Sequence, residues 1–468
     1  MRQLKIGTSW VRGVIGDAFT PELAIQFACA FGTYCDGGSV VLGRDTRRSS
    51  PMLHAAVQSA LISTGCRVID LGVCTTPLVS HAVRRHGAAG GISITGSHND
   101  AEWNALKFLG PTGSLLNAAN SEELLDIYHA SAYSFSGWDG LQRTVLDDGA
   151  VASYVDDLVR DLDAAAIRAK GYRVAVDFSN GAAHGVCSRF LGQLSCELVP
   201  LNERPARRFS HAPAPQVENM RQLEAVLPYV RADVGAAINV DGDRAGFVTH
   251  DGRALSEEIA LPLVADHVLG RRPGLVVTNL STSQMVDAVA ARHGSAVLRA
   301  EVGEGYVMDR AALEGAVVCG EGCGGVALTP QSATFDALQT LGRVLEAMAL
   351  SGATLADLTA DLPVLAMRKG ELACSPDRVY RVIEAVREEF DDAAVNEADG
   401  VRLAWPHQWL HVRASNTEPI VRIIAEAPDQ ATLDTLFSRA DTAARRGASG
   451  FGRTDHGAAG SAVRSGKP

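Results

Sequence analysis

GGISITGSHN, residues 90–99, is the stretch that decides the fold, because a run of apolar residues ends there in a polar turn containing glycine. The runs SVVLGRD (39–45) and CRVIDLG (66–72) have the same form, with β-branched residues followed by a polar loop. Helical patterns at 21–31 and 51–62 separate these runs. Strands that alternate with helices predict a mainly parallel α/β sheet covered by helices.

The same alternation returns twice along the chain. The later strand patterns lie at 172–181, 196–202, 234–248, 274–280, 295–303 and 315–322. Three sets of similar size predict three similar α/β domains with mixed or parallel sheets.

The pattern changes near residue 362. The order becomes strand, helix, two strands and a long helix, which predicts a smaller α+β domain at the C-terminal end. Residues after 446 are rich in Gly, Ser and Ala without periodicity, which is typical of disorder. We therefore predict α/β domains at 1–145, 146–250 and 251–361, an α+β domain at 362–446 and a disordered tail at 447–468.

Composition excludes several classes of function. The 468 residues include 43 Lys and Arg against 54 Asp and Glu, a net charge of −11, which argues against nucleic acid and anionic membranes as partners. No apolar run approaches the roughly 20 residues of a membrane span. The first ten residues lack the apolar segment of a secretory signal. Nine scattered cysteines without a CxxC pair predict a reduced, cytoplasmic protein.

The turn after the 90–94 run carries a serine where ligands bind in open α/β sheets, at the carboxyl end of a strand. Ser97, followed by His98, could be a nucleophile or a phosphate carrier. Lys107, ten residues further on, could stabilise a phosphoryl group during transfer. Taken alone, the commoner meaning of such a stretch is a turn with a capping serine.

A second loop, NVDGDR at 239–244, also follows a predicted strand. Acidic residues at alternate positions, Asp241 and Asp243, can converge on a hard cation such as Mg²⁺. The alternative is a polar turn whose aspartates bond their own backbone. The spacing is too short for a twelve-residue calcium loop.

Three further loops carry groups suited to a sugar phosphate. Glu321 in the glycine-rich stretch 320–325 could accept hydrogen bonds from vicinal hydroxyls. RASNTEP at 413–419, followed by Arg422, offers a guanidinium, hydroxyls and backbone N–H groups to a phosphate. The stretch 7–13 supplies Arg12. Each of these is also compatible with an ordinary turn.

These five elements, in this order, resemble the loops of the α-D-phosphohexomutases, a superfamily of phosphoglucomutases, phosphomannomutases and phosphoglucosamine mutases. The Ser97 loop with Asn104 and Lys107 resembles the phosphoserine loop, and 239–244 resembles the metal loop. The loop that contains Glu321 resembles the sugar-recognition loop, and residues 413–422 resemble the phosphate-binding loop. Further matching stretches are 43–50, 70–77, 176–183 and 302–305.

The resemblance implies four domains around a central cleft. It also implies a mutase in which phosphorylated Ser97 gives its phosphoryl group to a hexose monophosphate. The 1,6-bisphosphate then reorients and returns its other phosphate, so that phosphate moves between C1 and C6. A sugar phosphate is the implied partner, with Mg²⁺ as cofactor and hexose 1,6-bisphosphate as activator.

Site roles follow from the same resemblance. The implied catalytic residues are Ser97, Lys107, Arg12 and His98, and the implied metal ligands are Ser97, Asn239, Asp241 and Asp243. The implied substrate-binding residues are Arg244, Glu321, Cys323, Arg413, Ser415, Asn416, Thr417 and Arg422.

Several positions depart from the family pattern. Asn239 stands where the metal loop usually has a third aspartate, so we expect weaker Mg²⁺ binding or a water at that ligand. Cys323 and Gly325 replace the usual serine and histidine, and Trp10 replaces a glycine. The favoured interpretation is a mutase for a specialised sugar phosphate. The alternatives are a non-catalytic sugar-phosphate-binding paralogue and a metal-dependent sugar phosphatase.

Overall fold

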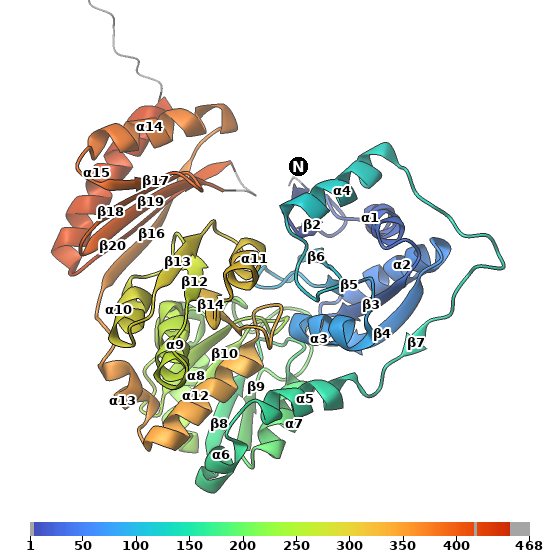
Figure 1. Cartoon of the computed structure of the whole chain (residues 1–468), viewed down its shortest axis with the longest axis horizontal. Coiled ribbons are helices and arrows are strands. Elements are labelled where there is room, and N and C mark those ends of the chain that lie inside the picture. Colours follow the sequence, from blue (N-terminus) through green and yellow to red (C-terminus); the bar gives the residue numbers. More distant parts are fainter. Residues whose placement is uncertain (1–3, 416–418, 450–468) are drawn as a thin grey trace, which may run out of the picture. The chain divides into compact units, whose positions relative to one another are not determined.

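The computed structural model describes residues 4–415 and 419–449. The chain divides into two compact units, Met1–Val364 and Leu365–Pro468 (Figure 1). The first unit contains three sheets with their helices, and the second contains one. The predicted class, three α/β domains and a smaller α+β domain, is confirmed.

The first sheet has seven strands in the order β1-β2-β6-β5-β3-β4-β7. Its strands are β1 (Lys5–Ile6), β2 (Trp10–Val14), β3 (Ser39–Arg44), β4 (Arg67–Val73), β5 (Gly90–Ile94), β6 (Trp103–Leu109) and β7 (Val145–Leu146). Its helices are α1 (Pro21–Tyr34), α2 (Ser50–Ser63), α3 (Thr76–His86) and α4 (Ala118–Ala130). Strands β5, β3, β4 and β7 are parallel, whereas β6, β2 and β1 pair antiparallel, so the sheet is mixed.

Alternation along β3 explains why helices cover both faces of this sheet. Val40 and Leu42 belong to one buried cluster, with residues of α1 and α2, while Val41 between them belongs to another, with residues of α3. Successive side chains of a strand point to opposite faces, so an apolar run such as VVL is buried only where both faces are covered.

The second sheet has the order β11-β10-β8-β9 and the third has the order β13-β12-β14-β15. The second is formed by β8 (Arg173–Asp177), β9 (Glu197–Leu201), β10 (Val234–Ile238) and β11 (Ala245–Thr249), and the third by β12 (Val276–Asn279), β13 (Val297–Ala300), β14 (Val318–Glu321) and β15 (Gly325–Leu328). The accompanying helices are α5 (Ala150–Arg160), α6 (Ala164–Lys170), α7 (His184–Gln193), α8 (Arg221–Val230), α9 (Ala260–Arg271), α10 (Met285–Arg292), α11 (Glu304–Glu314), α12 (Ala337–Ser351) and α13 (Leu355–Ala360). Short 3₁₀ helices occur at Val217–Asn219 and Glu257–Ile259.

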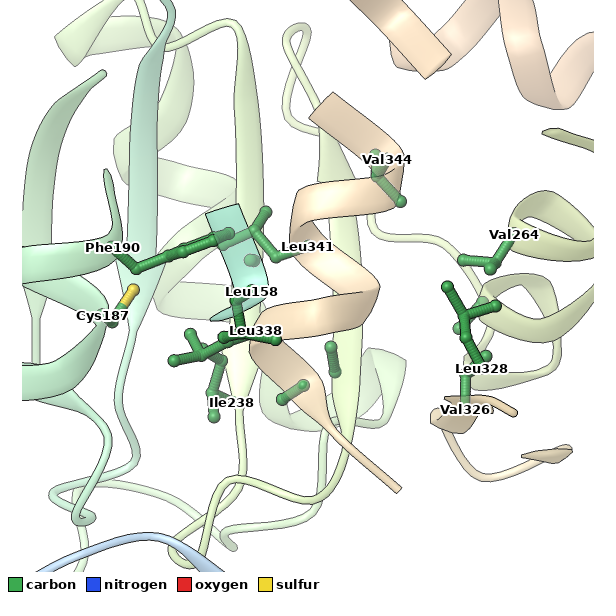
Figure 2. Packing of buried hydrophobic residues seen from close by; sticks show 14 of the residues in the cluster. Leu158, Cys187, Phe190, Ile238, Val264, Val326, Leu328, Leu338, Leu341 and Val344 are labelled. Carbon is green, nitrogen blue, oxygen red and sulfur yellow. The ribbon is translucent and has the colours of Figure 1, made fainter. Parts of the chain in front are cut away.

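Helix α12 joins the second and third sheets into one core. Figure 2 shows Leu338 and Leu341 on the side of Phe190, while Val344 lies on the side of Val264. All of these side chains belong to a single buried cluster. Close packing on both sides of one helix holds the loops of the two sheets in a fixed relation.

The second unit contains five strands in the order β16-β20-β19-β18-β17. They are β16 (Ala366–Ala373), β17 (Ala394–Asn396), β18 (Val401–Trp405), β19 (Gln408–Ala414) and β20 (Ile420–Ala427), with a 3₁₀ turn at Pro376–Arg378 and helices α14 (Val379–Glu389) and α15 (Gln430–Ser449). The sequence predicted only three strands. It missed β17, a short exposed strand at the sheet edge, and β20, a buried strand directly after the loop at 413–419.

The predicted tail needs one correction. Helix α15 continues to Ser449, so residues 447–449 are helical and not part of a disordered tail. Its apolar stripe, which includes Phe437 and Ala444, packs in the core of the second unit and extends the helix past the predicted end. Residues 450–468 lie outside the described residues.

Two other features concern the whole described chain. No helix within the described ranges is long and apolar enough to cross a membrane. All nine cysteines are free thiols.

Glu346 on α12 provides a prediction about acid stability. Its carboxylate accepts hydrogen bonds from His267 and Arg343, both at 2.7 Å, and from the N–H of Asp163 at 2.7 Å. Burial by itself raises the pKa of Glu346, but these donors outweigh it and lower the pKa from 4.5 to about 2. The stabilisation is therefore present above about pH 4.5 and lost as the pH falls toward 2.

We expect Glu346→Gln to lower the free energy of unfolding by about 2–4 kcal/mol at pH 7, with a smaller loss near pH 3. Urea midpoints at pH 7, 5 and 3 measure this difference. Glu122→Gln, on the exposed surface of α4, is the matched control and should shift the midpoint little at any pH. A Glu346→Gln effect that is independent of pH would contradict the prediction.

Candidate active site

Ser97 lies just beyond the carboxyl end of β5. It has a φ of +49°, a left-handed conformation that costs a serine about 1–3 kcal/mol. Its N–H donates to Thr95 Oγ1 at 2.9 Å, and only 5% of the residue is exposed. A strained, nearly enclosed hydroxyl at a strand end is typical of a functional position.

Arg47 holds the Ser97 loop in place. Its guanidinium donates to the carbonyl oxygens of Ser97 at 2.8 Å, Asn99 at 2.6 Å and Trp103 at 3.1 Å. Asp45 fixes the same guanidinium at 3.0 Å, with both side chains fully buried. Gly96 permits this approach, because a Cβ there would lie 2.7 Å from Arg47 Cζ. Arg47 is thus a positioning residue that the sequence analysis did not single out, although it lies in the stretch 43–50.

The loop at 239–244 connects β10 to β11 and contacts both neighbouring domains. The N–H of Thr76 donates to the carbonyl of Asp241, and the N–H of Ala337 donates to that of Gly242. Gly242 has a φ of +72°, and a Cβ on it would lie 2.7 Å from Thr75. Thr75 caps the N-terminus of α3 and so brings Thr76 to this loop.

Lys107 on β6 reaches across to this loop. Its Nζ lies 2.6 Å from Asp241 Oδ2 and 2.7 Å from Asp243 Oδ2, and the residue is buried. Burial favours a neutral amine, but the two carboxylates outweigh it and raise the pKa of Lys107 above its usual value. Burial also disfavours an ionised Asp243, yet Lys107 and Arg244 hold the pKa of Asp243 well below its usual range. Lys107 therefore serves as a fixed positive charge and not as a base.

Asn239 completes the cluster with its amide. Its Nδ2 donates to Ser97 Oγ at 3.3 Å, Asp241 Oδ1 at 3.0 Å and Asp243 Oδ1 at 2.5 Å. The four predicted metal ligands are thus together, but an amide N–H₂ group points into the space that their oxygens share. Mg²⁺ requires oxygen ligands, so the residues as arranged do not fit it. Among the described residues, no three His, Cys, Asp or Glu side chains are grouped to hold a metal ion.

Arg12 and Trp10 lie on the neighbouring strand β2. The guanidinium of Arg12 lies 3.9 Å from the centre of the Trp10 ring, and its Nη1 donates to Asn99 Oδ1 at 2.8 Å. Trp10 is directly opposite Lys107 in the strand pairing. The unusual tryptophan therefore has a clear structural role, because its ring holds Arg12 beside the Ser97 loop.

His98 follows Ser97 and is partly buried. Burial and the positive charges of Arg244 and Arg12 put the pKa of His98 well below 6.5, so its imidazole is neutral at pH 7. Its Nδ1 has no hydrogen-bond partner among the described residues. His98 is therefore a neutral imidazole beside Ser97, whereas Lys107 is a fixed cation.

Glu321 lies at the end of β14 and is held rigidly. Its Oε1 accepts hydrogen bonds from Asn279 Nδ2 at 2.7 Å and from the N–H of Gly303 at 2.8 Å. Cys323 Sγ lies 3.7 Å from the other carboxylate oxygen. Burial raises the pKa of the Cys323 thiol to about 12, so it remains a neutral donor to Glu321.

A backbone contact ties this loop to the 239–244 loop. Arg244 and Gly325 form an isolated β-bridge, and the N–H of Ala245 donates to the carbonyl of Gly324. Gly325 admits no side chain, because a Cβ would lie 2.3 Å from the ring of Phe335. The Phe335 ring therefore occupies the space that a side chain at position 325 would need.

Glu304, at the start of α11, is a residue of the site that sequence reasoning missed. Burial and Asp243 raise its pKa from 4.5 to about 8, and its Oε1 accepts the N–H of Phe335 at 2.9 Å. The only signal for it in the sequence was the stretch 302–305, which was noted as a match to the family without a role.

The second unit carries the remaining predicted residues. Arg413 and Arg422 face each other across β19 and β20. Arg413 bonds Asp399 at 2.8 Å, and Arg422 lies 3.6 Å from Glu371. The N–H of Ser415 donates to the carbonyl of Ile420. Asn416 and Thr417 lie outside the described residues.

The structure therefore brings ten predicted residues into the first unit. Hydrogen bonds or ion pairs connect Ser97, Lys107, Asn239, Asp241 and Asp243 directly. Arg12 joins them through the Ser97 loop, and Arg244 lies 3.8 Å from Asp243. A buried serine hydroxyl in a cluster that holds fixed positive charges suits the transfer of a phosphoryl group.

Four family domains match the chain in order. They are the phosphoglucomutase/phosphomannomutase alpha/beta/alpha domains I, II and III, at residues 3–134, 152–252 and 257–365, and the C-terminal domain at 364–443. The chain is 34% identical to a phosphoglucomutase/phosphomannomutase of Thermococcus kodakarensis, over 91% of this chain and 94% of the relative. It is 33% identical to a probable phosphoglucosamine mutase of Methanopyrus kandleri, with the same coverage.

Solved structures agree with these matches. A phosphoglucomutase/phosphomannomutase family protein from Burkholderia thailandensis superposes with a TM-score of 0.82 at 29% identity, covering 94% of this chain and 97% of that one. Fold, site and matches together define an intramolecular phosphotransferase. The chain belongs to the phosphoglucomutase/phosphomannomutase family.

Proposed function

We propose that this phosphohexomutase moves a phosphoryl group between C1 and C6 of a hexose phosphate through a phosphoserine at Ser97 and a hexose 1,6-bisphosphate. The observation that carries the proposal is the position of Ser97, a strained and nearly enclosed hydroxyl within reach of the 239–244 loop. The names of the relatives from T. kodakarensis and M. kandleri support a sugar phosphate as substrate.

In the first step, a substrate hydroxyl attacks the phosphorus of phosphorylated Ser97. The bond from phosphorus to Ser97 Oγ breaks as the new P–O bond forms, and the hydroxyl proton finally resides on Ser97 Oγ. His98 is the group we assign to carrying that proton, because it follows Ser97 directly and its Nδ1 has no hydrogen-bond partner among the described residues. The bisphosphate then turns, and the reverse transfer restores phosphorylated Ser97.

Fixed charges support the transfer. Lys107 and Arg244 lie at the 239–244 loop, and Arg12 is held beside the Ser97 loop by Trp10 and Asn99. Positive groups that are already oriented stabilise the charge on a transferring phosphoryl group without reorganising.

Substrate recognition is assigned to two places. Glu321, with Cys323, would accept the ring hydroxyls, since Asn279 and Gly303 fix the orientation of its carboxylate. The paired arginines Arg413 and Arg422, with Ser415, Asn416 and Thr417, would bind the phosphate that does not react. Arg413 and Arg422 are directly opposed in the pairing of β19 and β20, which supports this assignment because it places two guanidinium groups together.

Two measurements test the proposal. Protein incubated with glucose 1,6-bisphosphate should gain about 80 Da and about two negative charges in intact mass and isoelectric focusing. Coupled assays with glucose, mannose and glucosamine phosphates, plus a trace of bisphosphate, should then show isomerisation. Release of free phosphate would instead indicate a phosphatase, and binding without either reaction would indicate a sugar-phosphate-binding paralogue.

A further inference from the structure

The orientation of the Asn239 amide is set by two backbone groups. Its Oδ1 accepts the N–H of Asp243 and the N–H of Arg244, both at 3.1 Å. Neither N–H can act as an acceptor, so a flipped amide would place its N–H₂ against two donors and its oxygen against two carboxylates. Each unsatisfied buried group costs about 1–3 kcal/mol, and Asn239 is fully buried. The N–H₂ therefore points to Ser97, Asp241 and Asp243.

Every carboxylate oxygen of the loop already accepts a donor. The Asn239 amide bonds one oxygen of Asp241 and one of Asp243. Lys107 Nζ bonds the other oxygen of each, and Thr76 Oγ1 adds a hydrogen bond to Asp241 at 2.9 Å. A divalent cation would have to displace the amide from this network, and the amide has no alternative orientation of comparable energy.

The charges around the 239–244 loop also argue against a bound divalent cation. Lys107 balances one of the two carboxylates, and Arg244 Nε lies 3.8 Å from the other. That buried Nε has no hydrogen-bond partner among the described residues. In the unphosphorylated protein, a loop with two aspartates beside Lys107 and Arg244 has no excess of negative charge for a dication to neutralise.

We propose that the Asn239 amide and Lys107 take the place of a divalent cation, so that this site bridges Ser97 to Asp241 and Asp243 by hydrogen bonds and does not hold resident Mg²⁺. The inference rests on the proposed function only in that Ser97 is the phosphate carrier. This inference differs from the expectation that Mg²⁺ binds more weakly, because here the amide donates to the same oxygens that a metal ion would require.

Direct binding of Mn²⁺ tests this, with free Mn²⁺ measured by electron paramagnetic resonance in the absence of sugar phosphate. We expect unphosphorylated wild-type protein to bind no Mn²⁺ at this site below about 1 mM. Asn239→Asp replaces the N–H₂ group with a carboxylate oxygen and should bind one Mn²⁺ at least about 100-fold more tightly. Asn239→Asp combined with Asp243→Asn should return to the wild-type level.

Asn120→Asp on α4 is the matched control, because it adds the same charge away from the site and should not create binding. One Mn²⁺ per wild-type chain at submillimolar affinity, displaced by Mg²⁺, would overturn the inference whether or not the variants fold. Equal affinities of wild type and Asn239→Asp would overturn it too. A failure of the mutase proposal would instead be seen as absent phosphorylation of Ser97, which this measurement does not involve.

Discussion

Ser97→Ala is expected to remove isomerisation by at least about 10⁴-fold and to abolish the mass increase after incubation with hexose 1,6-bisphosphate. The reason is that the hydroxyl would carry the phosphoryl group in both transfers, so no other residue can substitute for it. Binding of sugar phosphate should persist, since Glu321 and the other predicted substrate contacts are unchanged. Intact mass and a coupled assay measure the two losses.

Two further variants make the Ser97 result specific. Ser97→Gly also lacks the hydroxyl but relieves the left-handed backbone at φ +49°, so it should be folded and inactive even if the alanine variant is unstable. Ser134→Ala changes an exposed serine and should behave as wild type. Isomerisation within tenfold of wild type in both Ser97 variants would contradict the assignment.

Lys107→Met is expected to have the largest effect on stability. The substitution removes an ammonium that lies 2.6 Å and 2.7 Å from two buried carboxylates. An uncompensated buried charge costs about 3–5 kcal/mol of unfolding free energy at pH 7. Transfer should be lost as well, because the fixed positive charge beside Ser97 disappears.

The pH dependence of this loss has a definite sign. Burial already holds the pKa of Asp241 above its usual value, and without Lys107 the pKa values of Asp241 and Asp243 should both rise, because Lys107 lowers both. A carboxyl group with a raised pKa destabilises the folded state increasingly as the pH rises above the unfolded value near 3.8. The difference in urea midpoint between wild type and Lys107→Met should therefore be larger at pH 8 than at pH 5.

A second substitution separates charge from packing. Lys107→Met combined with Asp241→Asn removes one charge of each sign and should recover a large part of the stability at pH 8. Lys170→Met, an exposed lysine at the end of α6, should cost less than about 0.5 kcal/mol. A loss at Lys107→Met that is equal at pH 5 and pH 8 and is not relieved by the double substitution would show that packing, and not charge, dominates.

The sequence was sufficient to predict the class of fold and the loop that carries Ser97. The strand patterns at 39–45 and 90–97 correspond to β3 and β5, because a parallel strand that is covered on both faces has a nearly continuous run of apolar residues. Two strands of the second unit were not predicted: β20, although it is a buried apolar run, and β17, whose local pattern is weak. The edge strand β17 is exposed, so it has no apolar run by which it could be recognised.

Local pattern also nominated the predicted site residues Ser97, 239–244 and Glu321, because they lie at or just beyond the end of a strand. Ser97 follows β5, the 239–244 loop follows β10, and Glu321 ends β14. The carboxyl ends of strands are where α/β domains bind ligands, so residue type and position along the chain were enough to nominate them. Their roles stay predictions until the experiments above are done.

Only the tertiary structure decided what these side chains face. Lys107 and Asp241 are 134 residues apart in the chain, and no local pattern indicates that they form an ion pair. The sequence shows that Asn239 replaces an aspartate, but not that two backbone N–H groups turn its amide toward Ser97. Secondary structure depends on neighbours along the chain, whereas hydrogen bonding and charge in a buried site depend on which distant segments the folded core brings together.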